Sequence, residues 1–282
     1  MNIEDLKHRG FVTLKYPSEL RGRVQEAMAS WRRFCDLPDA QKALLAGGDR
    51  LNDFGYMRRR DTGATADNKE LFHATKREMP VLADRARAIA DERAVQFIHA
   101  VDQLITSIEP AVASFAALVE HRYGLAGFEQ AVKTSVDRWV FRYLHYFPGE
   151  TLANAHADRG GFTLHLFESA PGGEYLDLHK RWQPWPVSEE ETIIFPGMVL
   201  QHRSRGDLKA LWHRVVSTEA TKASGRFSMV VFVDLRHTHR YNDGAKRLQD
   251  FEAGFNYDLP FSELEKLFMP GSVNEEFRPA RL

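Results

Sequence analysis

The sequence has little of several features that would point to particular classes of protein. It contains a single cysteine, Cys35, so no intrachain disulfide can form. No stretch approaches the ~18 uninterrupted apolar residues of a membrane span, and the first residues lack the basic and apolar regions of a secretory signal. The formal net charge is −1, so neither sign dominates in a way that favours nucleic acid or an anionic membrane. These absences predict a cytoplasmic protein with no nucleic-acid or membrane partner.

The N-terminal part of the chain has the apolar spacing of helices. Residues 18–37 place apolar side chains at intervals of three and four, with Ser18 as the expected N-cap. A second helical pattern covers 83–123, where Pro110 is expected to interrupt or kink the helix and Gly124 to close it. The intervening residues 46–72 are rich in glycine and charge and are expected to form loops.

From Asp137 onward the pattern changes to short apolar runs separated by Gly and Pro. Such a succession of strands without helices between them is typical of an antiparallel sandwich or barrel. Further helices are expected over 244–255 and 261–268. We therefore divide the chain into a mostly helical region (1–125), a β core (126–240) and a C-terminal helical extension (241–282), which together form one integrated unit.

His156 and Asp158 are the first candidates for chemistry. They lie two residues apart at the start of a strand pattern, so both side chains point to the same face. Alone, such a pair arises readily by composition, and a surface coincidence or a structural hydrogen bond is the commoner explanation. His213, on a later strand pattern, is the best third ligand. Two histidines and one carboxylate form the facial triad of non-haem Fe(II) oxygenases.

Arg226 and Ser228 supply a second motif of the same spacing, 13 residues after His213 for the arginine. A guanidinium beside a hydroxyl is suited to holding a carboxylate. The alternative is a surface arginine on an edge strand. Because the strand that follows is strongly apolar, Arg226 is expected to point into a cavity and to need an anionic partner there.

Several stretches together resemble one known family. The sequence is similar to the isopenicillin N synthase-like branch of the iron/2-oxoglutarate-dependent dioxygenases, and the similarity extends over most of the chain. It is carried, in order, by GFVTL, FCDLPDAQK, GY, DNKELF, HADRGGFTL, SRGDLKALWHRVV and RFS.

The resemblance implies an α+β fold: a double-stranded β-helix, or distorted jelly-roll, with flanking helices. It implies that His156, Asp158 and His213 bind Fe(II) and that Arg226 and Ser228 bind the distal carboxylate of 2-oxoglutarate. The family often has a tyrosine that contacts this cosubstrate, and here Tyr146 is the candidate, unless Phe147 occupies that position. Dioxygen would be the other cosubstrate, with ascorbate as an optional reductant.

The implied activity couples oxidative decarboxylation of 2-oxoglutarate to hydroxylation or another oxidation of a small molecule. Two alternatives stay open: an iron oxidase of the same fold that does not use 2-oxoglutarate, and a catalytically silent jelly-roll that binds a ligand or acts as a sensor. The sequence indicates neither the substrate nor the oligomeric state.

Other polar residues have less certain roles. Arg58, Arg59 and Arg60 are read either as recognising an acidic substrate or as a solvated loop, and Arg142 as facing the pocket or as forming a salt bridge. We expect His165 to be structural and the replacement of Lys69 to damage folding. Three further histidines are expected to have no catalytic role: His202, His237 and His239.

Overall fold

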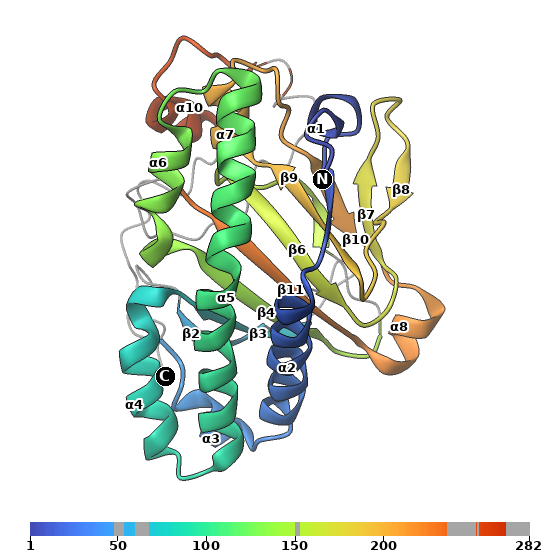
Figure 1. Ribbon diagram of the computed structural model, residues 1–282. Coiled ribbons are helices and arrows are strands. Elements are labelled where there is room, and N and C mark those ends of the chain that lie inside the picture. Colours follow the sequence, from blue (N-terminus) through green and yellow to red (C-terminus); the bar gives the residue numbers. More distant parts are fainter. Residues whose placement is uncertain (48–53, 60–67, 150–152, 236–251, 253, 269–282) are drawn as a thin grey trace.

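The computed structural model describes residues 1–47, 54–59, 68–149, 153–235, 252 and 254–268. Its centre is two antiparallel β-sheets, with most of the helices on the outer face of the larger one (Figure 1). This arrangement is the predicted jelly-roll with flanking helices.

The larger sheet has seven strands in the order β1-β9-β6-β11-β4-β3-β2. All of its pairings are antiparallel. Along the chain its strands are β1 (Val12–Lys15), β2 (Gly55–Arg59), β3 (Lys69–Ala74), β4 (Val140–Tyr146), β6 (Phe162–Glu168), β9 (Glu191–Pro196) and β11 (Arg226–Val233).

The smaller sheet has four strands in the order β5-β10-β7-β8. It faces the larger sheet and leaves a cavity between the two. Its strands are β5 (Ala153–Ala157), β7 (Gly173–Leu176), β8 (Trp182–Pro184) and β10 (Trp212–Val215).

Two long helices, α2 (Ser18–Cys35) and α5 (Glu92–Tyr123), pack together over the larger sheet (Figure 1). In α2, buried apolar residues such as Leu20, Val24 and Trp31 recur at helical spacing and form one face. Burial of this face against the rest of the protein stabilises the helix. The shorter helices are α1 (Asp5–His8), α3 (Asp39–Ala43), α4 (Met79–Ala88), α6 (Phe128–Lys133), α7 (Met198–Arg203), α8 (Glu219–Ser224) and α10 (Phe261–Phe268); single turns of 3₁₀ helix cover Lys76–Glu78 and Val136–Arg138.

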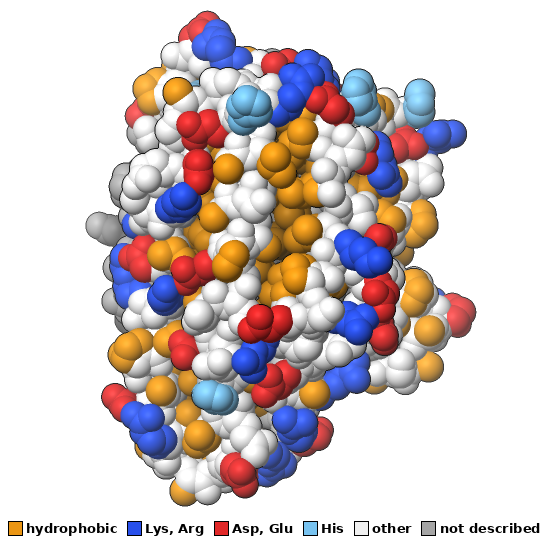
Figure 2. Space-filling view, viewed as in Figure 1, with side chains coloured by type: hydrophobic (Ala, Val, Ile, Leu, Met, Phe, Trp, Pro, Cys, Tyr) orange, Lys and Arg blue, Asp and Glu red, His pale blue; other side chains and the backbone are white. Residues whose placement is uncertain are grey.

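The helical face of the molecule carries no large area of a single charge. Figure 2 shows acidic and basic side chains intermixed around apolar ones over this face. No helix among the described residues is long and apolar enough to cross a membrane.

The helix expectations hold with three corrections. The pattern over 83–123 forms two helices, because α4 ends at Ala88 and α5 begins at Glu92, with Ala90 between them at a positive φ of 57°. Pro110 does not end its helix: α5 runs through it, and Ile108 and Val112 on either side are fully buried, so packing outweighs the missing backbone hydrogen bond. Gly124 closes α5 in the left-handed conformation, as expected. Ser18 is the first residue of α2, and Pro17 occupies the N-cap position. The helix expected over 261–268 is α10, whereas most of the one expected over 244–255 lies outside the described residues.

The loop expected over 46–72 is partly wrong, because β2 and the first residues of β3 lie in it. Every residue of β3 is buried, including Lys69, Glu70 and His73. Because these three are polar, the strand lacks the alternation of apolar residues by which strands are recognised in a sequence. β1 pairs with β9, and β3 pairs with β4. The region 1–125 therefore contributes strands to the same sheet as the core.

Candidate functional site

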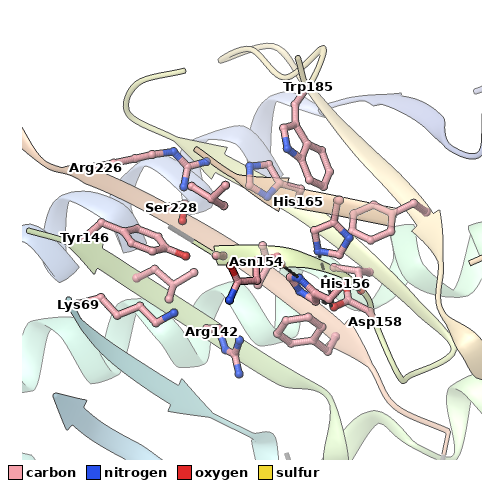
Figure 3. Close-up of a pocket in the computed structure, with 18 of the residues that line it drawn as sticks. Lys69, Arg142, Tyr146, Asn154, His156, Asp158, His165, Trp185, Arg226 and Ser228 are labelled. Carbon is pink, nitrogen blue, oxygen red and sulfur yellow. Dashed lines mark hydrogen bonds and ion pairs between the residues drawn. The ribbon is translucent and has the colours of Figure 1, made fainter. Parts of the chain in front are cut away.

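A cavity of about 310 Å³ lies between the two sheets. Its walls come from the inner faces of β4, β6 and β11 in the larger sheet and of β5 and β10 in the smaller one. All the residues predicted from the sequence for metal and cosubstrate binding line it: His156, Asp158, His213, Arg226, Ser228 and Tyr146. Figure 3 shows most of these side chains pointing into one space.

His156, Asp158 and His213 converge at one end of the cavity. Strands β5 and β10 pair so that His156 and His213 are directly opposite each other, and Asp158 follows the last residue of β5. Asp158 Oδ1 lies 3.7 Å from His156 Nε2 and 3.8 Å from His213 Nε2. One ligand atom from each residue lies within 4.8 Å of the other two, which is the spacing that a single metal ion requires.

Hydrogen bonds to backbone carbonyls fix the orientation and the tautomer of both imidazoles. His156 Nδ1 lies 2.7 Å from the carbonyl oxygen of Asn154, and His213 Nδ1 lies 3.1 Å from that of Leu211. A carbonyl only accepts, so each Nδ1 carries the proton and each Nε2 offers its lone pair to the convergence point. Burial, together with the nearby His156, lowers the pKa of His213 to about 4, so His213 is neutral near pH 7.

The carboxylate of Asp158 is held from the side away from the histidines. Thr163 Oγ1 donates a hydrogen bond of 2.6 Å to Asp158 Oδ2, which leaves Oδ1 directed at the two imidazoles. The turn that follows Asp158 is tightly packed: a Cβ added to Gly161 would lie 3.0 Å from the carbonyl oxygen of Val233. The absence of a side chain at Gly161 therefore permits the close approach between this turn and the end of β11.

Arg226 and Ser228 lie farther along the inner face of the larger sheet, and both are almost fully buried. Arg226 is held by two partners: Nε donates to the carbonyl oxygen of Ala170 at 3.2 Å, and Nη2 donates to Glu168 Oε2 at 2.5 Å. Burial alone would raise the pKa of Glu168, but His165 and Arg226 lower it, so Glu168 is ionised at neutral pH. Sequence reasoning missed this partner. Glu168 fixes the guanidinium group of Arg226, and the remaining N–H groups of that guanidinium border the cavity.

Strand alternation points Tyr146 into the cavity and Phe147 away from it. Tyr146 pairs with Arg226 across β4 and β11, and its ring lines the cavity with the Arg226 guanidinium carbon 5.8 Å from its centroid. Phe147 is not among the lining residues and packs edge-on against His145.

His165 and Lys69, which were not assigned to the site from the sequence, both line the cavity. His165 forms part of the cavity wall and stacks on Trp185 with ring centroids 4.7 Å apart. Lys69 also lines the cavity, whereas its neighbour Glu70 points to the opposite side of β3. His165 and Lys69 therefore both border the cavity, and their structural role stays a prediction. The shared strand face of Thr163 and His165 could have placed His165 in the cavity.

The arginines separate into outward and inward residues. Arg58 is ion-paired with Asp39 outside the cavity, Arg59 lines the cavity, and Arg60 lies outside the described residues. Arg142 lines the cavity, in agreement with the first of its two readings. His202 hydrogen-bonds to the carbonyl of Leu259 and takes no part in the site, and His237 and His239 lie outside the described residues.

Comparisons with known proteins agree with this geometry. Residues 137–235, which contain all the predicted site residues, match the family model described as the 2OG-Fe(II) oxygenase superfamily. Over this range the chain is similar to the 2OG-Fe(II) oxygenase superfamily. The isopenicillin N synthase-like branch named from the sequence fits within it.

Individual proteins with a similar sequence or structure are more distant. The 2-oxoglutarate-dependent dioxygenase caaD of Aspergillus niger is 32% identical over 124 residues, which span 39% of this chain and 37% of that relative. A Caulobacter crescentus protein assigned to the 2OG-Fe(II) oxygenase family superposes with a TM-score of 0.67 at 25% identity, over 82% of this chain and 79% of the other. A Neurospora crassa protein solved in complex with alpha-KG superposes with a TM-score of 0.68 at 17% identity, over 86% of this chain and 85% of the other. At this identity the similarity shows the shared fold alone.

The residues present fit the groups that this superfamily binds. Two imidazole nitrogens and a carboxylate oxygen suit Fe(II), and their side chains leave the cavity side of the convergence point open. A buried, fixed guanidinium beside a serine hydroxyl suits the distal carboxylate of 2-oxoglutarate.

Proposed function

We propose that this protein is an Fe(II)/2-oxoglutarate-dependent oxygenase that oxidises a small molecule, with dioxygen as the second cosubstrate and ascorbate as a possible reductant. The observation that supports this most strongly is that the His156, Asp158 and His213 ligand atoms converge in the same cavity that Arg226 and Ser228 line. Iron with 2-oxoglutarate and dioxygen would supply the oxidant, and the hard chemistry belongs to these groups.

The chain itself would perform three tasks. His156, Asp158 and His213 would hold the metal on one face, with Thr163 and the two backbone carbonyls fixing their donor atoms. Arg226, Ser228 and Tyr146 would orient the cosubstrate from its far end. The apolar and aromatic side chains of Trp185, Phe195 and Phe232 would limit water in the cavity.

Anaerobic titration with Fe(II) and 2-oxoglutarate tests the proposal without a known substrate. The wild type is expected to give the weak visible charge-transfer absorption of iron chelated by a 2-oxo acid, while His156→Ala and Asp158→Ala give none. Arg226→Met should need at least tenfold more 2-oxoglutarate to reach the same absorption, with iron binding unchanged. Arg58→Met, which removes an equal charge outside the cavity, should behave as the wild type.

The outcomes also separate the alternatives. Iron binding without any absorption upon addition of 2-oxoglutarate would favour an oxidase that does not use this cosubstrate. Failure to bind iron at all would favour a silent ligand-binding protein.

A further inference from the structure

Strand β6 connects the two ends of the cavity. Near its start, Thr163 donates a hydrogen bond of 2.6 Å to Asp158, one of the three candidate metal ligands. At its end, Glu168 accepts a hydrogen bond of 2.5 Å from Arg226, the candidate anchor for the distal carboxylate. β6 is paired on both edges, with β9 and with β11, so it cannot shift along its own axis without breaking both sets of pairings. One internal strand therefore spaces the metal end from the cosubstrate end.

The guanidinium of Arg226 is held along one of its two edges. Nε donates to the carbonyl oxygen of Ala170 at 3.2 Å, and Nη2 donates to Glu168. The aliphatic stem passes Gly172, where an added Cβ would lie 3.7 Å from both Cδ and Nε of the arginine. The other edge, formed by Nη1 and the second N–H of Nη2, is the one that can bind a carboxylate by two parallel hydrogen bonds. The groups on the first edge fix the direction of the second.

Glu168 acts on the cavity only through Arg226. It is not among the described residues that line the cavity, and its side chain is 12% exposed. Burial alone would raise the pKa of Glu168, but His165 and Arg226 lower it, so the carboxylate stays ionised. A buried carboxylate with these partners has little freedom to move. Glu168 is therefore a positioning residue for the guanidinium.

His165 holds the Glu168 carboxylate from the direction of the metal. It lies two residues after Thr163 on the inner face of β6, and its Nε2 lies 3.4 Å from the Glu168 oxygen that Arg226 also contacts. Its ring stacks on Trp185. Figure 3 shows His165 between Arg226 and the candidate metal ligands. The packed imidazole limits movement of the carboxylate toward the metal.

We propose that Glu168 selects the chain length of the 2-oxo diacid cosubstrate, because it fixes, through Arg226, the distance between the metal and the group that holds the distal carboxylate. The inference rests on the proposed function, which places the 2-oxo acid end of 2-oxoglutarate at the metal and its distal carboxylate at Arg226. A diacid that is one methylene longer must bend to reach both ends. Diacids of equal charge are then separated by geometry alone.

Anaerobic titration of the Fe(II)-loaded protein with three 2-oxo acids tests the inference without turnover. 2-Oxoglutarate and 2-oxoadipate carry the same charge and differ by one methylene, and 2-oxopentanoate keeps the five-carbon chain but lacks the distal carboxylate. The visible absorption of the chelated acid reports the binding of each. Glu168→Asp shortens the link to Arg226 by one methylene, and Glu168→Leu removes it. Glu174→Asp is the matched control, because Glu174 pairs with Arg214 at 2.7 Å outside the cavity.

We expect the wild type to bind 2-oxoglutarate about tenfold more tightly than 2-oxoadipate. In Glu168→Asp the guanidinium is drawn back toward β6, so this ratio should fall about fivefold in favour of the longer acid, while Glu174→Asp retains it. Glu168→Leu should weaken 2-oxoglutarate binding about tenfold, because no charge-assisted hydrogen bond directs Arg226. 2-Oxopentanoate should bind equally to the wild type and all three variants, since it does not reach Arg226.

Equal binding of the two diacids by the wild type, or an unchanged ratio in Glu168→Asp, would overturn the inference. Tighter binding of 2-oxoglutarate by Glu168→Leu would also overturn it, because Glu168 would then act only by opposing the charge of the ligand. If Glu168→Leu fails to bind 2-oxopentanoate, its fold is damaged, and the ratio measured with Glu168→Asp decides alone. No absorption with any of the three acids in the wild type would instead contradict the proposed function.

Discussion

Thr163 shows how much of the site depends on residues that do not face the metal. Its hydroxyl bonds the Asp158 oxygen that points away from the histidines, at 2.6 Å. The backbone N–H of Met198 donates to the carbonyl of Asp158 at 2.8 Å, so both the side chain and the backbone of this residue are fixed. Ligands held in this way need little reordering when a metal binds, and that favours affinity.

Replacing Thr163 by Val should therefore weaken metal binding without altering the three ligands. We expect the affinity for Fe(II), or for Mn(II) as a stable substitute, to fall about tenfold, because the Asp158 carboxylate is free to rotate. Calorimetric titration of the metal measures this effect. Thr163→Ser keeps the hydroxyl and serves as the control, and an unchanged affinity in Thr163→Val would show that the hydrogen bond has no such role.

At the scale of elements, two motifs with no assigned function meet each other. Lys42 of α3, from the stretch FCDLPDAQK, places its Nζ 2.7 Å from Oε2 of Glu70 of β3, from the stretch DNKELF. Tyr56 and His145 also hydrogen-bond to the same carboxylate, at 2.8 Å each. This network ties α3, β2, β3 and β4 together on the side of the sheet away from the cavity.

The same cluster also brings Cys35, Glu70 and His145 within metal-binding distance of one another. Two observations make it a structural network instead. The ammonium of Lys42 already occupies the carboxylate and would repel a cation. Burial, with Glu70 nearby, raises the pKa of the Cys35 thiol, so it is protonated and a poor ligand.

Glu70 should stabilise the fold in a pH-dependent way. Burial alone would raise its pKa, but hydrogen bonds from His145, Lys42 and Tyr56 lower it from 4.5 to about 2. A carboxyl whose pKa is lower in the folded state adds stability above its unfolded pKa and loses it as the pH falls towards the folded value. The contribution of Glu70 is therefore complete above pH 4.5 and declines between there and pH 2.

We accordingly expect Glu70→Gln to lower the free energy of unfolding by about 3–5 kcal/mol at pH 7, because it leaves the Lys42 charge buried without its counter-charge. The difference from the wild type should shrink steadily below pH 4.5. Urea unfolding at a series of pH values measures both effects. The double variant Lys42→Met/Glu70→Leu, which removes both charges, should recover part of the loss. A difference independent of pH would contradict this role of the ionised carboxyl.

At the scale of the whole molecule, the two sheets meet at the site. His156 and His213 belong to the smaller sheet, whereas Arg226 and Ser228 belong to the larger one. A metal and a cosubstrate that bind between them would link the two layers across the cavity. Binding to the folded state alone stabilises it by mass action.

Mn(II) and 2-oxoglutarate together should therefore raise the Tm more than either alone. At a hundredfold excess over Kd, a ligand that binds only the folded state adds about 2.7 kcal/mol, and a shift of several degrees is expected for a chain of this size. Differential scanning fluorimetry measures the shift, and a chelator should reverse the part due to the metal. Asp158→Ala should show no metal-dependent shift, and a full shift in that variant would place the metal elsewhere.

Local spacing in the sequence marked two residue pairs of the candidate site and the two long helices. Positions two apart on a strand share a face, so His156 with Asp158 and Arg226 with Ser228 were recognisable as pairs, and apolar intervals of three and four marked α2 and α5. The same rules could not show that His213 lies opposite His156, or that Glu168 fixes Arg226. Nor could they bring Lys69 and Arg142 into one cavity. Those contacts depend on which strands pair and in which register, and pairing joins residues far apart in the chain. Only the packed sheets decide it.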